Sequence, residues 1–212
     1  MKKRSTQNTA CNFRTNLTEA PDRQNVISDS PAIYREEDER AQWMVSSRRV
    51  LEGWEEEYGL DLSIFLPDTY GSEYFFSRVA TKPMLETWKG SRHDSGPSRI
   101  YGDRRIQMYL ENDIDPTGKL IVFSDGLNVP LMDELERYFR GRIQTTFGIG
   151  TNLTNDAGFA PLSMVVKVVE ANGLPVAKLS DNIAKASGNP DEIARVKRIS
   201  GYSETFNESC RY

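Results

Sequence analysis

Three polar loops in this chain each follow a short apolar run, and their residues are of types that bind phosphate, sugar or metal. The first loop begins at Asp68, the second contains Ser124 and Asp125, and the third contains Gly148 and Gly150. An apolar run of this kind followed by a polar loop is typical of a buried parallel strand. In parallel α/β folds the carboxyl ends of the strands gather on one side, where ligands bind. We therefore expect the three loops to converge.

The third loop, FGIGTNLT, places two glycines two positions apart and then Thr151. Glycine lets backbone N–H groups approach a phosphate with no Cβ in the way, and the Thr151 hydroxyl adds a further donor. The spacing therefore predicts a phosphate site. The alternative is a tight turn after a strand that binds no ligand.

The second loop contains the tripeptide Ser124–Gly126. The carboxylate of Asp125 suits a ribose hydroxyl or a hydrated Mg²⁺, because carboxylate oxygens are good ligands for hard cations. The alternative is that Asp125 caps the helix predicted to begin near Leu131.

A fourth segment, RHDSG, places a cation, an imidazole, a carboxylate and a hydroxyl in succession from Arg92 to Ser95. The planar fork of Arg92 suits a carboxylate or phosphate, and Asp94 suits sugar hydroxyls or developing positive charge. The alternative is a solvated turn. His93 is the single histidine of the chain, which excludes a metal site or mechanism that needs two. A lone histidine is more often a packing or hydrogen-bonding residue.

The elements that must position these loops alternate along the chain. Strands are expected directly before the three loops, and helical patterns cover 101–111 and 131–139. This order predicts an α/β sheet or a segment of a barrel. Further along, Asn172-Gly173 between two apolar stretches is a strong hairpin signal. Asn189 followed by Pro190 predicts the start of a helix.

The N-terminal part has a different character. Residues 1–30 are polar and lack periodicity, which predicts a disordered leader. Residues 31–58 set apolar side chains among charged ones, as one or two amphipathic helices would.

Composition excludes several classes of protein. The 212 residues carry a formal charge of −4 and are 38% apolar, so the chain can form a core but does not resemble a general nucleic-acid binder. The sequence contains neither a run of about 20 apolar residues nor an apolar signal segment, so we expect no membrane association. Cys11 and Cys210 lie near opposite ends and indicate no disulfide framework. We expect a cytoplasmic protein.

At these loops the sequence resembles the C-terminal half of the nicotinate phosphoribosyltransferase family. The matching stretches occur in the family's order over about 46–202, and they include IFLPDTYG, RHDSG, DPTGKLIVFSDGLNV, YFRGRIQTTFGIGTNLTND and PLSMVVKVVEANGLPVAKLSDN. Several long motifs in one order make the resemblance highly specific.

The resemblance implies an enzyme of NAD biosynthesis that converts nicotinate and phosphoribosyl pyrophosphate to nicotinate mononucleotide and pyrophosphate with coupled ATP hydrolysis. It implies a partial, irregular TIM-like barrel of the type II phosphoribosyltransferase kind over 31–212. Mg²⁺ would enter with phosphoribosyl pyrophosphate, and ATP would be a co-substrate. No protein-bound metal site is expected. The roles implied are catalytic for Asp94 and Asp68, and substrate-binding for Arg92, Ser95, Ser124, Asp125, Gly126, Gly148, Gly150 and Thr151.

The sequence also departs from the family's pattern. The motif T-S-x-H-E, which carries the family's phosphorylated histidine, is expected near residues 20–30, and the sequence there is DRQNVISDSPA. We therefore expect a truncated chain that a complementary N-terminal polypeptide, or a second copy of itself, would complete. Unpaired strand edges also favour oligomerisation. The alternative is a non-catalytic fragment that binds phosphate or nucleotide.

Overall fold

The structure, a computed structural model, describes residues 32–150, 153, 158, 165–203 and 206–208. The chain divides into two compact units, Met1–Gly59 and Leu60–Tyr212. In the first unit the described residues form one helix, α2 (Ala32–Tyr58). The predicted disordered leader, residues 1–30, lies outside the described residues.

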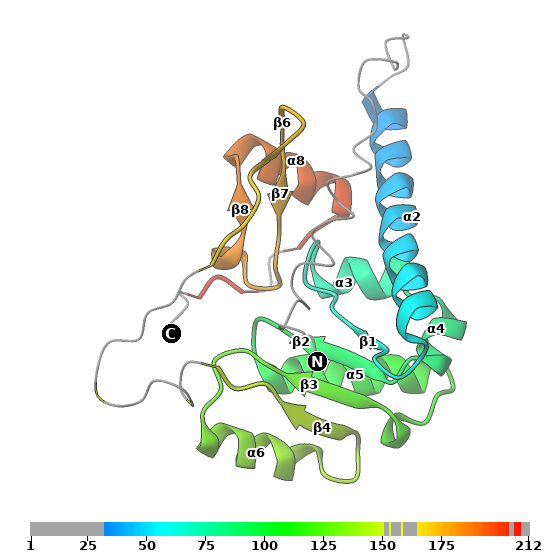
Figure 1. The fold of residues 1–212 in the computed structure, drawn as a ribbon, viewed down its shortest axis with the longest axis vertical. Coiled ribbons are helices and arrows are strands. Elements are labelled where there is room, and N and C mark those ends of the chain that lie inside the picture. The colour runs from blue at the N-terminus through cyan, green and yellow to red at the C-terminus, as the bar shows by residue number, and fades with distance from the viewer. Residues whose placement is uncertain (1–31, 151–152, 154–157, 159–164, 204–205, 209–212) are drawn as a thin grey trace, which may run out of the picture. The chain divides into compact units, whose positions relative to one another are not determined.

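The second unit is built on a four-stranded parallel sheet (Figure 1). The order of the strands in the sheet is their order in the chain: β1 (Ile64–Phe65), β2 (Gly90–His93), β3 (Leu120–Phe123) and β4 (Gln144–Phe147). The parallel sheet confirms the predicted α/β class, and β1, β3 and β4 lie where the sequence predicts strands.

Strand β2 corrects the interpretation of RHDSG as a solvated turn. Arg92 and His93 are the last two residues of a central strand, and only the residues from Asp94 onward form the loop. Ser91 and His93 are fully buried. The Tyr101 hydroxyl donates a hydrogen bond to the Ser91 Oγ at 2.9 Å, so this buried hydroxyl has a partner. A strand made of polar residues lacks the apolar run by which buried strands are identified.

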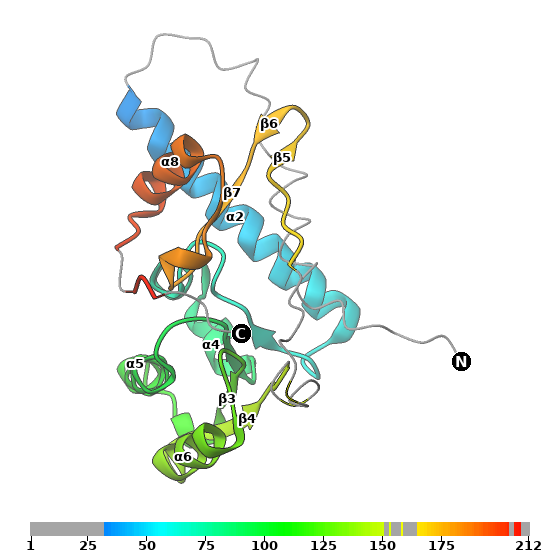
Figure 2. The same ribbon diagram turned by 90° about the vertical axis from the view of Figure 1, so that its left-hand side faces the viewer.

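Helices connect the successive strands. Their bounds are α3 (Ser72–Tyr74), the π-helical η2 (Phe75–Val79), α4 (Lys82–Thr87), α5 (Ser98–Glu111), η3 (Pro116–Gly118) and α6 (Val129–Phe139). Helices α5 and α6 confirm the two predicted helices and lie on the same side of the sheet (Figure 2). Gly102 lets α5 approach α6 closely, because a Cβ at this position would lie 2.2 Å from the Phe139 ring.

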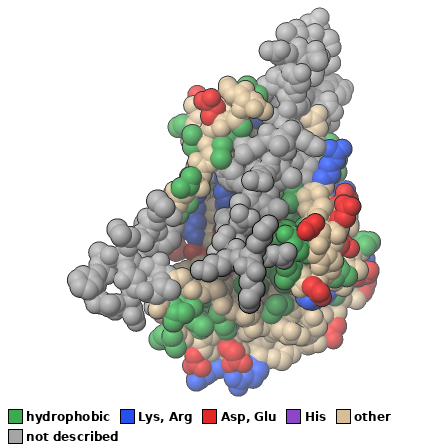
Figure 3. Space-filling view, in the orientation of Figure 1, with side chains coloured by type: hydrophobic (Ala, Val, Ile, Leu, Met, Phe, Trp, Pro, Cys, Tyr) green, Lys and Arg blue, Asp and Glu red, His purple; other side chains and the backbone are tan. Residues whose placement is uncertain are grey.

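The core of the second unit is aromatic. Phe65 of β1 stacks on Trp88 with ring centroids 4.4 Å apart, and Phe123 of β3 stacks on Phe139 of α6 at 5.5 Å. All four side chains are buried. The outer face of α6 carries charged pairs at i and i+4, and acidic and basic side chains lie together there at the lower edge of Figure 3.

The C-terminal part of the second unit contains two short antiparallel ladders and a helix. The elements are β5 (Glu170–Ala171), β6 (Leu174–Pro175), β7 (Ala177–Lys178), η4 (Ile183–Lys185), β8 (Ser187–Gly188) and α8 (Pro190–Ser200). Asn172 and Gly173 have positive φ angles of 51° and 74° between β5 and β6, which confirms the predicted hairpin. The Asn189 side chain accepts a hydrogen bond from the Asp191 amide, as the predicted cap requires.

In the part of the chain that the structure describes, no helix has both the length and the apolar character that crossing a membrane requires.

Candidate active site

Four of the predicted site residues meet where β2 and β3 end. The Arg92 guanidinium donates from Nε to the Ser124 Oγ at 2.9 Å and from Nη2 to an Asp94 carboxylate oxygen at 2.8 Å. The Ser124 hydroxyl in turn donates to the backbone carbonyl of His93 at 2.7 Å. The guanidinium therefore joins the two loops and fixes the direction of the Asp94 carboxylate.

The fourth residue, Asp125, is held by a side chain that the sequence analysis did not single out. The Lys185 ammonium donates to an Asp125 carboxylate oxygen at 2.5 Å and to the backbone carbonyl of Asp94 at 2.8 Å. Lys185 is the last residue of η4 and lies 60 positions from Asp125 in the sequence. Short-range spacing carries no signal for such a pair, so only the fold identifies it.

The alternative role considered for Asp125, that of a helix cap, is wrong. Asn128 is the N-cap of α6, and its side-chain oxygen accepts a hydrogen bond from the Leu131 amide at 2.9 Å. Because Asn128 caps α6, the Asp125 carboxylate has no capping role, and it pairs with Lys185.

Asp68 lies in the loop three residues after β1 and is 3% exposed. One carboxylate oxygen accepts hydrogen bonds from the Ser95 hydroxyl at 2.6 Å, the Ser180 hydroxyl at 3.0 Å and the Asp181 amide at 3.0 Å. The other oxygen accepts from the Lys178 ammonium at 2.7 Å. Burial by itself raises the pKa of Asp68, but the charge of Lys178 and these hydrogen bonds outweigh it and hold the pKa below its ordinary value. Asp68 is therefore an ionised anchor inside the protein.

The segment that holds Asp68 also holds the start of α3. The Asp181 carboxylate accepts from the Ser72 amide at 2.7 Å and from the Ser72 hydroxyl at 2.5 Å. Burial raises the pKa of Asp181 above its ordinary value. The segment 178–185 thus supplies polar side chains to the loops after β1, β2 and β3.

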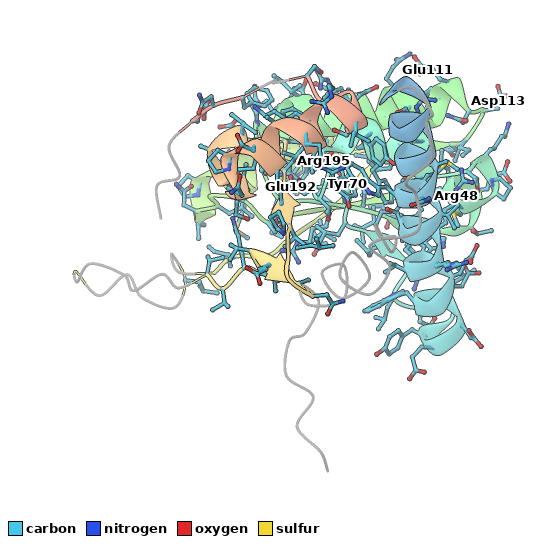
Figure 4. The ribbon with its side chains drawn as sticks, turned by 90° about the horizontal axis from the view of Figure 1, so that it is seen from above. Arg48, Tyr70, Glu111, Asp113, Glu192 and Arg195 are labelled. Atoms are coloured by element: carbon cyan, nitrogen blue, oxygen red, sulfur yellow. The ribbon has the colours of Figure 1, made fainter. Side chains whose placement is uncertain are left out.

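Helix α8 lies beside the same first loop. Figure 4 shows Tyr70 next to Glu192 and Arg195 of α8. The Arg195 guanidinium makes two hydrogen bonds to the Glu192 carboxylate, at 2.9 and 2.6 Å. Burial raises the pKa of the Tyr70 hydroxyl, so this residue stays neutral near pH 7.

The glycine loop after β4 is only partly described. The Gly148 amide donates to the Phe123 carbonyl at 2.8 Å, so in this structure its hydrogen is used within the protein. Gly126 has a φ of 59°, the left-handed conformation that favours glycine. Thr151 lies outside the described residues. The predicted phosphate contacts of Gly126, Gly148, Gly150 and Thr151 remain predictions.

His93 packs in the core, as a lone histidine was expected to do. It is fully buried, its Nε2 lies 2.9 Å from the Gly96 carbonyl, and its ring lies 4.9 Å from that of Tyr101. Burial lowers the pKa of His93, which keeps the imidazole neutral near pH 7.

The comparison with known proteins decides the family. A model of the nicotinate phosphoribosyltransferase (NAPRTase) family matches residues 31–204. The chain belongs to this family.

Similar proteins are longer than this chain. Two curated proteins named nicotinate phosphoribosyltransferase, from Psychromonas ingrahamii and Cupriavidus necator, are 44% identical over 141 residues and 47% identical over 150 residues. These alignments cover 66% and 70% of this chain but 35% and 38% of the relatives. The chain therefore spans well under half the length of these two relatives.

Solved structures with this name also match the chain over only part of their own length. A nicotinate phosphoribosyltransferase from Vibrio cholerae matches with a TM-score of 0.70 at 38% identity, over 76% of this chain and 40% of that one. Another, from Porphyromonas gingivalis, matches with a TM-score of 0.69 at 31% identity, over 82% of this chain and 47% of that one.

The nicotinate phosphoribosyltransferase family implies Mg²⁺, and the side chains of this site do not fit a metal ion bound by the protein alone. Among the residues that the structure describes, no group of three or more histidine, cysteine, aspartate or glutamate side chains is arranged to hold one. The carboxylates of Asp94, Asp68 and Asp125 are instead each paired with a cationic side chain.

Proposed function

We propose that this chain contributes the phosphoribosyl pyrophosphate site of a nicotinate phosphoribosyltransferase. The proposed reaction joins nicotinate to the ribose of phosphoribosyl pyrophosphate, releases pyrophosphate and is coupled to ATP hydrolysis. The observation that carries the proposal is the cluster of Arg92, Asp94, Ser124 and Asp125 at the ends of β2 and β3, in a chain of this family.

The chemistry explains these residue types. As pyrophosphate leaves the ribose, positive charge builds on the ring, and a carboxylate fixed beside it stabilises that charge. Arg92 holds the Asp94 carboxylate in one direction, so its orientation is set before the substrate arrives. In this proposal Asp125 and Ser124 bind the sugar hydroxyls, while the buried Ser95, predicted to bind substrate, donates its hydroxyl hydrogen to Asp68 instead.

We further infer that residues 31–212 form part of a TIM-like barrel. The support is the strand order: four parallel strands lie in the sheet in chain order, as strands do in a barrel. Strands β1 and β4 are the outer strands of the sheet in the described residues. A complementary N-terminal polypeptide or a second copy of this chain would pair with them.

The test is formation of nicotinate mononucleotide from nicotinate, phosphoribosyl pyrophosphate and MgATP. The chain is assayed alone and mixed with the separately produced N-terminal part of the Cupriavidus necator relative. We expect product in the mixture, and its loss with Asp94→Asn but not with Asp113→Asn, whose side chain is 92% exposed. No product from either preparation would refute the proposal.

A second candidate function, phosphate or nucleotide binding without turnover, is favoured by the partial coverage of the relatives. Binding of phosphoribosyl pyrophosphate without product in the mixture would support this candidate.

A further inference from the structure

A short segment near the end of the chain, residues 206–208, lies against the start of η4. Phe206 and Asn182 form a parallel bridge, in which the Ile183 amide donates to the Phe206 carbonyl at 3.0 Å. The Asn182 side chain donates to the Glu208 carbonyl at 2.8 Å and accepts from the Glu208 amide at 3.1 Å. Asn182 therefore holds the main chain of Glu208 by both of its polar groups.

Gly96, in the loop after β2, leaves the space that the Phe206 ring occupies. Its φ is 82°, the left-handed conformation that favours glycine, and a Cβ at this position would lie 3.1 Å from a ring carbon of Phe206. Gly96 follows Asp94 by two residues. The ring therefore packs on the loop that carries a predicted catalytic carboxylate.

Asn182 connects residues 206–208 to the candidate site. It is 6% exposed, its amide donates to the Ser95 Oγ at 3.3 Å, and its side-chain oxygen caps η4 by accepting from the Ala184 amide at 3.2 Å. Short 3₁₀ turns such as η4 have poor internal hydrogen-bond geometry, so contacts from outside decide whether they stay in place. The turn ends at Lys185, whose ammonium donates to the Asp94 carbonyl at 2.8 Å.

Residues 206–208 can detach without unfolding the sheet. Asn207 and Glu208 are exposed and Phe206 is half-buried, so detachment uncovers little apolar surface. Regions with few buried contacts and exposed backbone hydrogen bonds open at low free energy while the core stays folded. Tyr202, whose hydroxyl donates to the Ser180 carbonyl at 2.5 Å, is a separate attachment that such an opening leaves in place.

We propose that residues 206–208 form a latch that positions η4 and the loop after β2, and that the cluster at the ends of β2 and β3 binds its diphosphate ligand tightly only while the latch is docked. Detachment removes the contacts that the latch makes with Asn182, Ile183 and Gly96. The observed affinity for the ligand then falls with the fraction of molecules in which the latch is docked. The identity of the ligand rests on the proposed function, whereas the positioning of η4 does not.

The test compares two substitutions at one position of the full chain. Glu208→Pro removes the amide hydrogen that the Asn182 side chain accepts, whereas Glu208→Ala keeps it and changes an exposed side chain. Hydrogen exchange is measured at the amides of Ile183 and Lys185, which donate to the carbonyls of Phe206 and Asn182. We expect exchange there to be at least about tenfold faster in Glu208→Pro, and unchanged in Glu208→Ala.

Two controls separate the latch from a general loss of structure. The amides of β3, which lies inside the sheet, should exchange at the same rate in both Glu208 variants. Phe206→Ala removes the ring from Gly96 and should act as Glu208→Pro does. Asn207→Ala changes the exposed neighbour and should behave as the unchanged chain does.

The effect on the site is measured as the affinity for phosphoribosyl pyrophosphate with Mg²⁺. We expect binding to weaken at least about fivefold in Glu208→Pro and Phe206→Ala, and to stay unchanged in Glu208→Ala and Asn207→Ala.

Three results would overturn the inference: equal exchange at Ile183 and Lys185 in the two Glu208 variants, an equally large increase in exchange at β3, or an unchanged ligand affinity in variants whose η4 exchanges faster. Failure of the proposed function is distinguishable. In that case the unchanged chain would not bind phosphoribosyl pyrophosphate, while η4 would still exchange faster in Glu208→Pro than in Glu208→Ala.

Discussion

At the scale of single residues, the role of a carboxylate follows from what surrounds it. Sequence reasoning assigns the same catalytic character to Asp68 and Asp94, and the structure gives them different surroundings. Asp94 is 27% exposed at the end of β2, whereas Asp68 is buried with a donor on each carboxylate oxygen. The donors Lys178 and Ser180 are 110 and 112 positions away in the sequence, so no local pattern could have predicted this difference.

Replacing Asp68 should therefore affect stability. Asp68→Asn keeps the shape of the side chain but leaves Lys178 partly buried without its counter-charge, and we expect a loss of about 3 kcal/mol in the free energy of unfolding. Urea unfolding measures this loss. The control is Asp61→Asn, because Asp61 is 99% exposed and lies 3.9 Å from Lys89. Equal stability of the two variants would show that Asp68 is not an anchor.

His93 gives a prediction about pH. Its pKa in the folded protein is lowered by burial from an ordinary value of 6.5, so the unfolded chain binds a proton at a pH where the folded chain does not. The contribution of His93 to the free energy of unfolding is therefore fully present above pH 6.5 and decreases as the pH drops below 6.5. Since the chain has a single histidine, His93→Gln should show a smaller change in urea midpoint between pH 7.5 and 5.5 than the unchanged protein. An equal change in both would contradict the assignment.

At the scale of elements, the sequence predicts the strands and helices whose patterns are local. The apolar run of β3, the strand β4, the helices α5, α6 and α8, and the Asn172-Gly173 turn are all confirmed, but β4 is the polar sequence QTTF and is not buried. Strand β2 was missed because its buried side chains are those of serine and histidine, so it lacks the apolar run by which a buried strand is identified. The Lys178–Lys185 run was missed as part of the site because its partners lie in other elements.

The packing of α5 on α6 gives a prediction at this scale. Gly102→Ala places a Cβ against the Phe139 ring, which is fully buried, and should destabilise the protein by about 1–3 kcal/mol. The matched control is Gly53→Ala in α2, where a Cβ meets nothing within 4 Å, and it should stabilise by about 0.5–1 kcal/mol. Thermal unfolding followed by circular dichroism compares the two. A Gly102→Ala variant with the same unfolding temperature as the unchanged protein would contradict the close packing of α5 on α6.

At the scale of the whole molecule, the chain carries the family's strand-end loops but spans 35–47% of the length of the relatives compared. The proposed reaction also needs what these relatives carry in the rest of their length. The strand-end cluster is complete enough to be tested by itself, because its partners Arg92, Asp94, Ser124, Asp125 and Lys185 all lie within the second unit.

The most direct test of the central claim is therefore the binding of phosphoribosyl pyrophosphate with Mg²⁺, measured by isothermal titration calorimetry. We expect the unchanged chain to bind it, Asp94→Asn to bind at least about tenfold more weakly through loss of a charged contact, and Asp113→Asn to bind as the unchanged chain does. Absence of binding to the unchanged chain, or equal affinity in Asp94→Asn, would contradict the assignment of this cluster as the phosphoribosyl pyrophosphate site.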